Sequence, residues 1–495
     1  MGEVNGEGSE QSDDKAKPKL RGTPSPVGVK ARQMGREVRD RMPLLTGLTH
    51  LPDSIKRAIR NPQSELRTRE GLSPEAALHA THNFRSGVLN GVMFTMVDGL
   101  IAPSLVLALF VKHLGGDNVL VGLLPSLVTG GWFLPQILVA GRVQGRTHMM
   151  DWYLRSGIVR IAILALLTVV TILLANMPLV LLVVFFFCYA VYSFAAGVSG
   201  IPWIEMVGKT IAPRRRGSFF GLRNFWGGLL ALLVAAPVGL IVSEQFLGLT
   251  FPYNFALLFG ATTVVVSLGV YFWVAVKEPA AIEVAPSLSI RKLLRRGMEA
   301  YRTDSDYRSF MISRILLSLA TVSDPFYVVY AQAHLGAPAG TVGLYLAALS
   351  IASLLSNFIW SPLADRASNR TLMTLAVLVT ALVPLIAVLV SMFIGTWDNV
   401  FLYTSFTLVF IMSGLALGAS RIVNNNMVLT VAPPAERATY VGFLNAILGV
   451  VIFVPVLGGL VVDVLGFLVI FVASLVLAAL ALLASTRMST KRPFQ

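Results

Sequence analysis

Two carboxylates stand inside long apolar stretches of this sequence. Asp98 lies in the first stretch, roughly 15 Å along a helix from where the stretch begins, and Asp324 lies in a later one. Each is followed by a proline, Pro103 or Pro325, and the two prolines recur about 220 residues apart, as in a duplicated chain. Ionisable residues deep in apolar segments are costly and are functional by default. We predict that Asp98 and Asp324 exchange protons beside weakened helices; permanent pairing with a buried arginine is the alternative.

Arg314 lies in the same apolar stretch as Asp324. The two are ten residues apart, about 15 Å along a helix, so they cannot pair directly within one segment. An arginine at this depth must face water, a carboxylate of another segment, or a bound solute. We predict contact with solute or with a water-filled cavity for Arg314. Arg160, in the third apolar stretch, is predicted to be a structural partner for a neighbouring helix.

Aromatic and amide side chains in these stretches could complete a site for a small solute. Rings can stack on sugars and on drug-like molecules alike, so they predict a site without selecting its ligand. A polar cluster that closes the tenth stretch could gate one side of the cavity, and helix-end capping is its alternative. The predicted solute contacts are Phe94, Tyr192, Tyr327, Tyr330 and Asn424, together with Arg314.

A basic eight-residue turn occurs twice in the chain. Ala364–Thr371 and Ala140–Thr147 align without a gap, and both end in Arg-Thr. A carboxylate at a helix end, faced by arginines of the following turn, can hold helices together in one conformation and release them in another. The first copy has Gly141 where the second has Asp365, and anchoring of the arginines to anionic lipid is the alternative. The predicted latch residues are Asp365, Arg366, Arg370, Arg142, Arg146 and Arg216.

Membrane-spanning helices must position these residues. Hydrophobic residues make up 55% of the chain and charged residues 13%, and the mean hydropathy is +0.71, which fits a polytopic membrane protein rather than soluble domains. Twelve apolar runs reach the roughly 20 residues that a bilayer core requires. They are roughly 88–111, 119–140, 150–175, 178–204, 218–243, 253–276, 309–332, 341–363, 371–394, 400–422, 440–462 and 465–485.

Six of these runs precede a hydrophilic central stretch and six follow it. An even number per repeat gives both copies the same orientation. The predicted fold is therefore an all-α polytopic membrane protein, with 12 transmembrane helices as two parallel six-helix repeats. The expected divisions are a cytosolic polar N-terminal tail that could contain an amphipathic helix (1–82), an N-terminal six-helix bundle (83–276), a cytosolic central loop (277–308), a C-terminal six-helix bundle (309–486) and a cytosolic C-terminal tail (487–495).

The basic residues fall mainly in the connections on one side of the predicted spans. By the positive-inside rule, both termini are predicted to be cytoplasmic, and the net charge of +14 is a topology signal, not a nucleic-acid-binding surface. Ser73-Pro74-Glu75 has the composition of a helix start. The central stretch predicts a helix on the membrane surface, with a plain charged linker as the alternative. Its apolar positions are Ile290, Leu293, Leu294, Met298 and Tyr301.

The turn Leu363–Arg370 resembles the signature G-x-L-A-D-R-x-G-R-R/K of the major facilitator superfamily, and Pro213–Gly217 resembles the P-x-x-R-G turn of that family. The chain departs from the pattern at Gly141, where the family has Asp, and at Asn369, where it has Gly. The resemblance covers residues 85–485. It implies secondary transport by the rocking of two six-helix bundles, with the first, fourth, seventh and tenth helices lining a shared cavity.

We therefore expect a secondary active transporter that moves a small solute by alternating access, coupled to protons through Asp98, Asp324 or both. Uptake and efflux stay open, and a non-transporting membrane sensor on a transporter scaffold is the alternative. No catalytic set is clustered, so an enzyme is not expected, and the energy source would be a proton or other ion gradient rather than a cofactor. The expected partners are the lipid bilayer and a small-molecule substrate, with no nucleic acid. The expected state is a monomer in the plasma (inner) membrane.

Metal and thiol chemistry have little support in the sequence. Cys188 is the only cysteine and lies in an apolar run, so neither a disulfide framework nor a thiolate metal cluster is predicted. The six histidines are scattered. His79 and His82 have helical spacing but lie outside the predicted spans, so no metal site is predicted.

Overall fold

The computed structural model describes residues 72, 74–143, 148–279, 290–431 and 437–488. In these ranges every regular element is a helix. Twelve helical segments of the described chain are long and apolar enough to cross a membrane, which confirms the predicted spans. Several helices start earlier than the apolar runs. The first span begins at Ala80 rather than near residue 88, because polar residues continue the helix beyond the apolar core.

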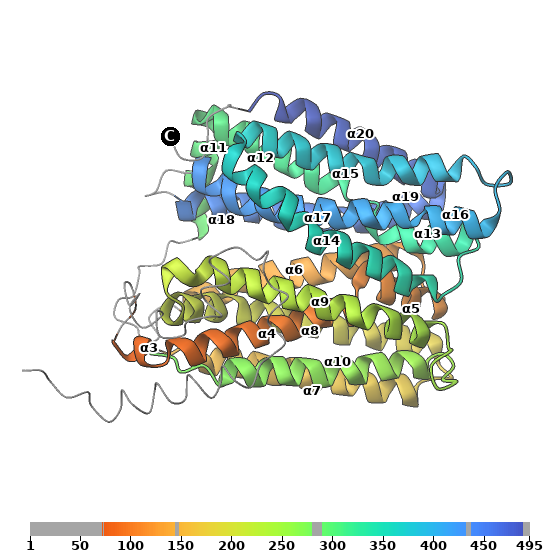
Figure 1. Ribbon diagram of the computed structural model, residues 1–495, viewed down its shortest axis with the longest axis horizontal. Helices are drawn as coiled ribbons and strands as arrows, with labels where there is room; N and C mark the ends of the chain where they lie inside the picture. The colour runs from red at the N-terminus through yellow and green to blue at the C-terminus, as the bar shows by residue number, and fades with distance from the viewer. Residues whose placement is uncertain (1–71, 73, 144–147, 280–289, 432–436, 489–495) are drawn as a thin grey trace, which may run out of the picture. The chain divides into compact units, whose positions relative to one another are not determined.

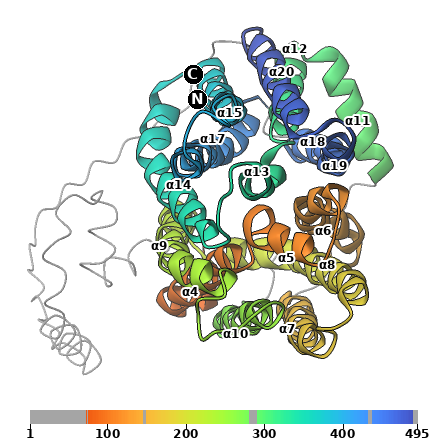
Figure 2. The same cartoon turned by 90° about the vertical axis from the view of Figure 1, so that its right-hand side faces the viewer.

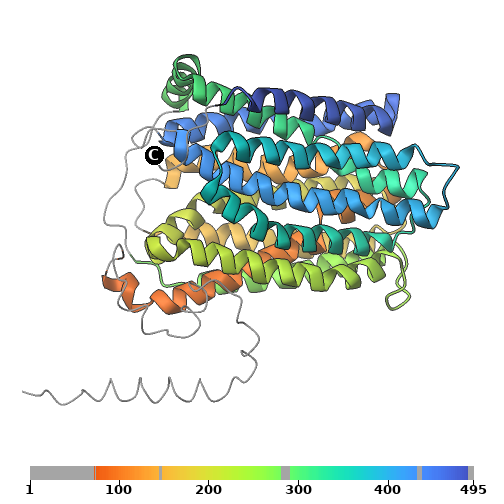
Figure 3. The ribbon, with the colours of Figure 1, turned by 45° about the horizontal axis from the view of Figure 1, so that its top comes forward.

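The first six spans form one group of helices (Figures 1 and 3). A short helix begins at Pro74 with Glu75 in its first turn, as predicted. The elements of this group are α3 (Pro74–Leu78), α4 (Ala80–Leu100), η3 (Pro103–Leu107), α5 (Ala108–His113), α6 (Asn118–Val143), α7 (Met150–Leu173), α8 (Pro178–Thr210), η4 (Pro213–Arg215), α9 (Arg216–Val242) and α10 (Tyr253–Val274).

The second group of helices holds the other six spans. Its elements are α11 (Ile290–Thr303), α12 (Ser305–Ala320), η5 (Asp324–Phe326), α13 (Tyr327–His334), α14 (Thr341–Arg366), α15 (Asn369–Ser391), α16 (Asn399–Ser405), α17 (Thr407–Val431), α18 (Arg437–Val451), α19 (Val454–Leu465) and α20 (Phe467–Ser485). We call the end of the helices that carries α3, α11 and the start of α18 the terminal face. The end that carries α5, α13 and α16 is the opposite face (Figure 1).

The first span of each group is broken at the same place. In the first group α4 ends at Leu100 and the chain resumes with a π-helical turn at Pro103. In the second group α12 ends at Ala320 and a 3₁₀ turn begins at Asp324-Pro325. Proline lacks a backbone N–H and clashes with the preceding turn, so it ends or kinks a helix. The predicted weakening of both helices beside the carboxylates is confirmed.

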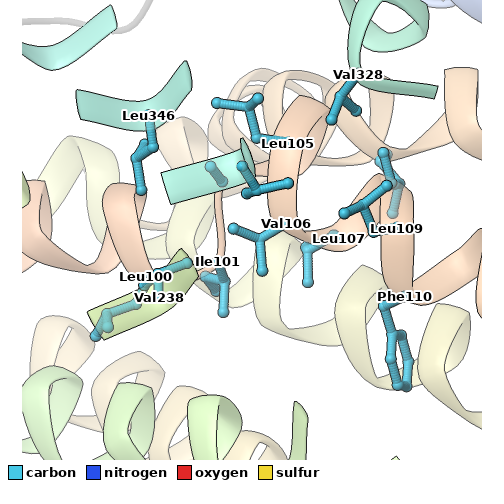
Figure 4. Packing of buried hydrophobic residues seen from close by; sticks show 14 of the residues in the cluster. Leu100, Ile101, Leu105, Val106, Leu107, Leu109, Phe110, Val238, Val328 and Leu346 are labelled. Atoms are coloured by element: carbon cyan, nitrogen blue, oxygen red, sulfur yellow. The ribbon is translucent and has the colours of Figure 1, made fainter. Parts of the chain in front are cut away.

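The segments that follow the two breaks close the opposite face. Side chains of η3 and α5 are fully enclosed, from Leu105 to Phe110 (Figure 4). They pack against Val238 of α9, Val328 of α13 and Leu346 of α14, so all these elements meet in one apolar cluster. The segments after both breaks are therefore densely packed against the other group of helices at the opposite face.

Glycines bring the two groups into close contact. The α-carbon of Gly343 on α14 would lie 2.9 Å from a β-carbon placed at Gly239 on α9. A β-carbon at Gly122 on α6 would overlap the carbonyl of Pro455 on α19. Small residues let helix backbones approach closely in membranes. The α9–α14 and α6–α19 pairs therefore form the main interfaces between the groups (Figure 2).

Two hydrogen bonds fasten α6 to the eleventh span. That span is interrupted before Pro455, and the freed carbonyl of Ile452 accepts a hydrogen bond of 2.7 Å from the hydroxyl of Ser126. At the opposite face, the side-chain amide of Asn118 donates to the Asp463 carboxylate at 2.6 Å. Asp463 thereby places a negative charge at the N-terminus of α6, where the helix dipole favours it.

The central helix α11 forms where its apolar spacing predicts it. Gly297 and Ala300 are buried, and a β-carbon at Gly297 would overlap the ring of Phe443 on α18. Leu294 and Met298 are exposed. One side of α11 therefore packs on the protein, and contact of the exposed side with a membrane surface stays a prediction.

Candidate functional site

Asp98 faces the interface between the two groups. It occupies the last turn of α4, immediately before the helix break, and its side chain is exposed although the span is otherwise largely enclosed. Its carboxylate interacts electrostatically with Arg421 of α17, in the second group, and with Arg160 of α7, in the first. Asp98 is thus an exposed carboxylate in a span whose following segments, η3 and α5, are enclosed. Arg421 is exposed in the same way.

Arg160 is held between two aromatic rings. Its guanidinium carbon lies 4.4 Å from the ring centre of Phe94 and 4.8 Å from that of Tyr192. It also donates a hydrogen bond of 2.9 Å to the Tyr192 hydroxyl. Such cation–π contacts are stronger where water is excluded. Two predicted solute contacts, Phe94 and Tyr192, thus surround an arginine that sequence reasoning had assigned to structural pairing, beside the predicted proton carrier Asp98.

A second polar network lies nearer the terminal face, on the same helix as Asp98. Arg223 of α9 donates to the carbonyl of Gly87 at 2.7 Å and to the side chain of Asn90 at 3.2 Å. Asn90 in turn donates to the Tyr153 hydroxyl at 2.9 Å. The Arg223 guanidinium also lies 4.8 Å from a Trp203 ring centre. Sequence reasoning missed Asn90 and Tyr153 as members of this network, although an asparagine inside an apolar run is itself a signal of a polar contact.

A stripe of small residues on α4 admits the Arg223 side chain. Gly87, Gly91, Thr95 and Gly99 recur every fourth residue, so they share one face of the helix. That face packs on α9. A β-carbon at Gly91 would overlap the Arg223 guanidinium. The spacing of these residues in the sequence could have predicted the α4–α9 contact, but not the arginine that fills it.

Asp324 has different surroundings. It is half-buried at the start of η5 and, within the described part of the chain, takes part in no ion pair. Its charge interacts with Tyr327, whose hydroxyl lies 2.7 Å from that of Ser323. The structure therefore does not bring Asp324 into the cluster around Asp98.

The other predicted solute contacts of the second group are also apart from Asp98. Tyr327 and Tyr330 are buried, with ring centres 5.0 Å and 5.1 Å from that of Phe471. Arg314 is half-buried on α12. The side chain of Asn424 lies outside the described residues. The roles of these four residues stay predictions.

Comparisons with known proteins agree with the arrangement of helices. A family model described as the Major Facilitator Superfamily matches residues 310–494. The matched residues fall in the second group of helices, so the model match covers that part of the chain. A variant of the nucleoside transporter NupG has a similar structure, with a TM-score of 0.63 and 16% identity over 82% of this chain and 100% of that one. No curated sequence matches the chain.

Two other solved transporters of this fold are comparably similar. A D-xylose-proton symporter gives a TM-score of 0.60 with 13% identity, over 84% of this chain and 98% of its own. A POT family transporter in complex with 5-aminolevulinic acid gives 0.60 with 13% identity, over 81% and 94%. At such identities the likeness establishes the fold of the superfamily and not a substrate.

The superfamily's signature turn is described only in part. The side chains of Asp365, Arg366, Arg142 and Arg146 lie outside the described residues, and Arg370 is half-buried. The latch hypothesis for these residues therefore stays a prediction. The sixth predicted latch residue is Arg216, which caps a helix end: it donates to the carbonyls of Gly208 at 2.9 Å and Ile211 at 3.2 Å. Cations are favoured at this negative end of a helix dipole.

A carboxylate from a distant segment caps the start of α7. Glu278, after α10, accepts hydrogen bonds of 2.9 Å from the backbone N–H groups of Met149 and Met150, at the start of α7. It also forms an ion pair of 2.8 Å with Lys209 at the end of α8, and its side chain is only 3% exposed. Glu278 thus ties three spans together at the terminal face. No sequence motif pointed to it.

Within the described residues, no group of three His, Cys, Asp or Glu side chains is placed to hold a metal ion. The charged groups of the site are therefore interpreted through ion pairs, hydrogen bonds and proton exchange. An exposed carboxylate flanked by two arginines and two aromatic rings can hold a proton or share its neighbours with a charged solute.

Proposed function

We propose that this chain is a proton-coupled secondary transporter that moves a small solute by alternating access, with Asp98 as the proton carrier. One observation carries the proposal. Asp98 is exposed in the middle of the helices, next to a helix break, and its charge interacts with an arginine of the other group. A proton carrier must reach water from one side at a time and sense the approach of the second group. The exposure of Asp98 and its electrostatic interaction with Arg421 of the second group support this role.

The same arrangement supports alternating access. The opposite face is closed by η3 and α5, and the Asn118–Asp463 and Ser126–Ile452 hydrogen bonds cross between the groups there. Opening that face requires these contacts to separate while the terminal side closes. Rigid-body rotation of packed groups is a common form of such a transition.

We also propose that the terminal face is cytoplasmic and that the membrane is the plasma (inner) membrane. Arginines cluster at this face, which favours the cytoplasmic side by the positive-inside rule. The exposed arginines of the described chain there include Arg214, Arg291, Arg295, Arg296 and Arg302. In this orientation the enclosed segments η3 and α5 lie on the side away from the cytoplasm. We propose a monomer, because each chain carries both groups of helices and the interface between them.

Flux measurements in liposomes that contain the purified full-length protein test the proton role. An entrapped pH-sensitive dye reports proton movement on addition of sugars, nucleosides, amino acids or organic acids. Asp98→Asn keeps the shape of the side chain and loses its titration. We expect pH-driven accumulation to fall to the passive level while exchange at equal pH persists. Asp151→Asn, at an exposed position of the terminal face, is the matched control and should behave as wild type.

Two outcomes would contradict the proposal. Retention of pH-driven accumulation in Asp98→Asn would remove Asp98 from the proton pathway, and equal loss of both modes would indicate a structural or solute-binding role. Absence of any flux in the wild-type protein would favour the non-transporting sensor instead. Where the wild-type protein does show flux, inverted membrane vesicles with an imposed pH gradient separate uptake from efflux.

A further inference from the structure

Among the described side chains, those around Asp98 carry more positive than negative charge. Arg160 and Arg421 both interact electrostatically with the Asp98 carboxylate, one from each group of helices. Tyr189 of α8 is a further titratable neighbour. From α9, Arg223 binds α4 nearer the terminal face, and α10 contains no charged side chain. The Asp98 carboxylate therefore lies within electrostatic range of two guanidinium groups and, among the described side chains, forms no direct ion pair with either.

Arg160 has hydrogen-bond donors that the described protein does not use. A guanidinium carries five N–H groups. The Arg160 side chain is 8% exposed and donates one hydrogen bond, to Tyr192, while its Nε has no partner. Unsatisfied donors of a buried cation are costly. The Phe94 and Tyr192 rings fix the guanidinium in place, so these donors are pre-oriented for a ligand.

We propose that this site binds the carboxylate of an organic anion between Arg160 and Arg421, in competition with Asp98. The proposal rests on the transport function proposed above and names its substrate class. Asp98 is within electrostatic range of both arginines but does not occupy the unpartnered Nε of Arg160, so this donor is open to the carboxylate of a solute. The Phe94 and Tyr192 rings provide apolar surface, which favours an organic body over an inorganic ion.

Competition for the two arginines couples the proton to the anion. When Asp98 takes up a proton from water, it loses its charge, and the arginines become free to bind the substrate carboxylate. When the anion leaves, Asp98 returns its proton to water and interacts again with Arg160 and Arg421. One proton and one carboxylate thus move together, and each increases the affinity for the other by the same factor.

Thermal unfolding of the purified full-length protein in detergent tests the site. The probes are two matched pairs, benzoate with benzamide and nicotinate with nicotinamide, and inorganic phosphate, each at pH 6 and pH 8. We expect the two carboxylates to raise the unfolding midpoint, more at pH 6 than at pH 8, and the amides and phosphate to have no effect. Both acids are ionised at both pH values, so the difference reports on the protein.

Substitutions separate the roles of the charged groups. Arg160→Gln and Arg421→Gln should each weaken carboxylate binding at least tenfold, because each removes charge-assisted hydrogen bonds. Asp98→Asn mimics the protonated acid, so it should bind benzoate equally well at both pH values. Arg295→Gln, on the exposed side of α11, is the control and should bind as wild type. If Arg160→Gln fails to fold, Arg421→Gln still tests the site, because Arg421 is exposed.

The outcomes distinguish this proposal from the transport function. Equal stabilisation by acid and amide, stabilisation by phosphate alone, or no acid-specific effect would overturn the anion site. Proton-coupled flux of a neutral solute without acid binding would overturn the anion site and leave the transport function in place. Acid-specific binding without any flux would retain the site and overturn transport.

Discussion

The first spans of the two groups are broken at corresponding places but differ in the turn that follows the break and in their surroundings. In the first group Asp98 precedes the break, is exposed, and lies within the field of Arg160 and Arg421. In the second group Asp324 follows the break and is half-buried, with Tyr327 as its electrostatic neighbour. The break depends on a local proline, whereas the charge environment depends on helices from elsewhere in the chain. The two halves of the duplicated chain therefore share the helix break but not the charged neighbours of the carboxylate beside it.

The largest expected effect separates the two carboxylates. Asp98→Asn should reduce pH-driven solute accumulation by about a hundredfold, which corresponds to roughly 2.7 kcal/mol, whereas Asp324→Asn should leave it within about threefold of wild type. The reason is that only Asp98 is both exposed and flanked by arginines. Accumulation in liposomes under an imposed pH gradient measures both variants. Loss of accumulation in Asp324→Asn would show that the two halves share the proton role.

The third helices of the two groups also begin differently. The N-terminus of α7 is capped by Glu278, which is distant in sequence and paired with Lys209. The N-terminus of α15 is capped by the local Ser368, which accepts from the Thr371 N–H. The first cap joins separate spans, and the second stabilises its own helix. Loss of the Glu278 cap should therefore lower the stability of the protein more than loss of the Ser368 cap.

Glu278→Gln should lower the stability of the protein by about 2–3 kcal/mol, since it removes a charge that pairs with the half-buried Lys209 and weakens the cap of α7. Thermal unfolding in detergent measures the change. Glu299→Gln, at an exposed surface ion pair with Arg295, is the control and should change stability by less than about 0.5 kcal/mol. A Glu278 variant as stable as this control would show that the connection between the three spans is dispensable.

Gly122→Ala should shift the conformational equilibrium away from the closed opposite face by about 1–3 kcal/mol, because the added β-carbon overlaps the Pro455 carbonyl. A cysteine at Leu105, introduced after Cys188→Ala, should then react faster with a thiol reagent added from the opposite side. Gly449→Ala is the matched control, because no described atom lies within 4 Å of a β-carbon there. Unchanged labelling in Gly122→Ala would mean that α6 and α19 do not separate when that face opens.

The smallest expected effect concerns the local cap of the second group. Ser368→Ala should lower the stability of the protein by about 1 kcal/mol, since it removes one side-chain acceptor at the start of α15. Ser368→Asp should restore most of this loss, because aspartate is an equally good cap and its charge suits the helix N-terminus. Thermal unfolding again measures both variants. A loss as large as that of Glu278→Gln would remove the proposed difference between local and distant caps.

Several features of the candidate site could be predicted from the sequence. Asp98 and its proline were visible because a charge inside an apolar run is rare, and Phe94 and Tyr192 lie on the helices expected to line the site. Arg160 was assigned to structural pairing, because its position in the sequence does not reveal that it interacts electrostatically with Asp98. Glu278 was missed because no local pattern marks it. Its role follows only from the packing of α7 and α8 beside the segment after α10.

The sequence by itself determined the twelve apolar spans, their division into two repeats and the position of both helix breaks. Each of these depends on neighbouring residues: apolar length sets a span, and proline sets a break. Only the tertiary structure decided that Asp98 has two arginine neighbours while Asp324 has none among the described side chains. It also decided which face of the described helices is closed. Both outcomes depend on side chains from segments far apart in the chain, whose encounter is set by helix packing and not by local pattern.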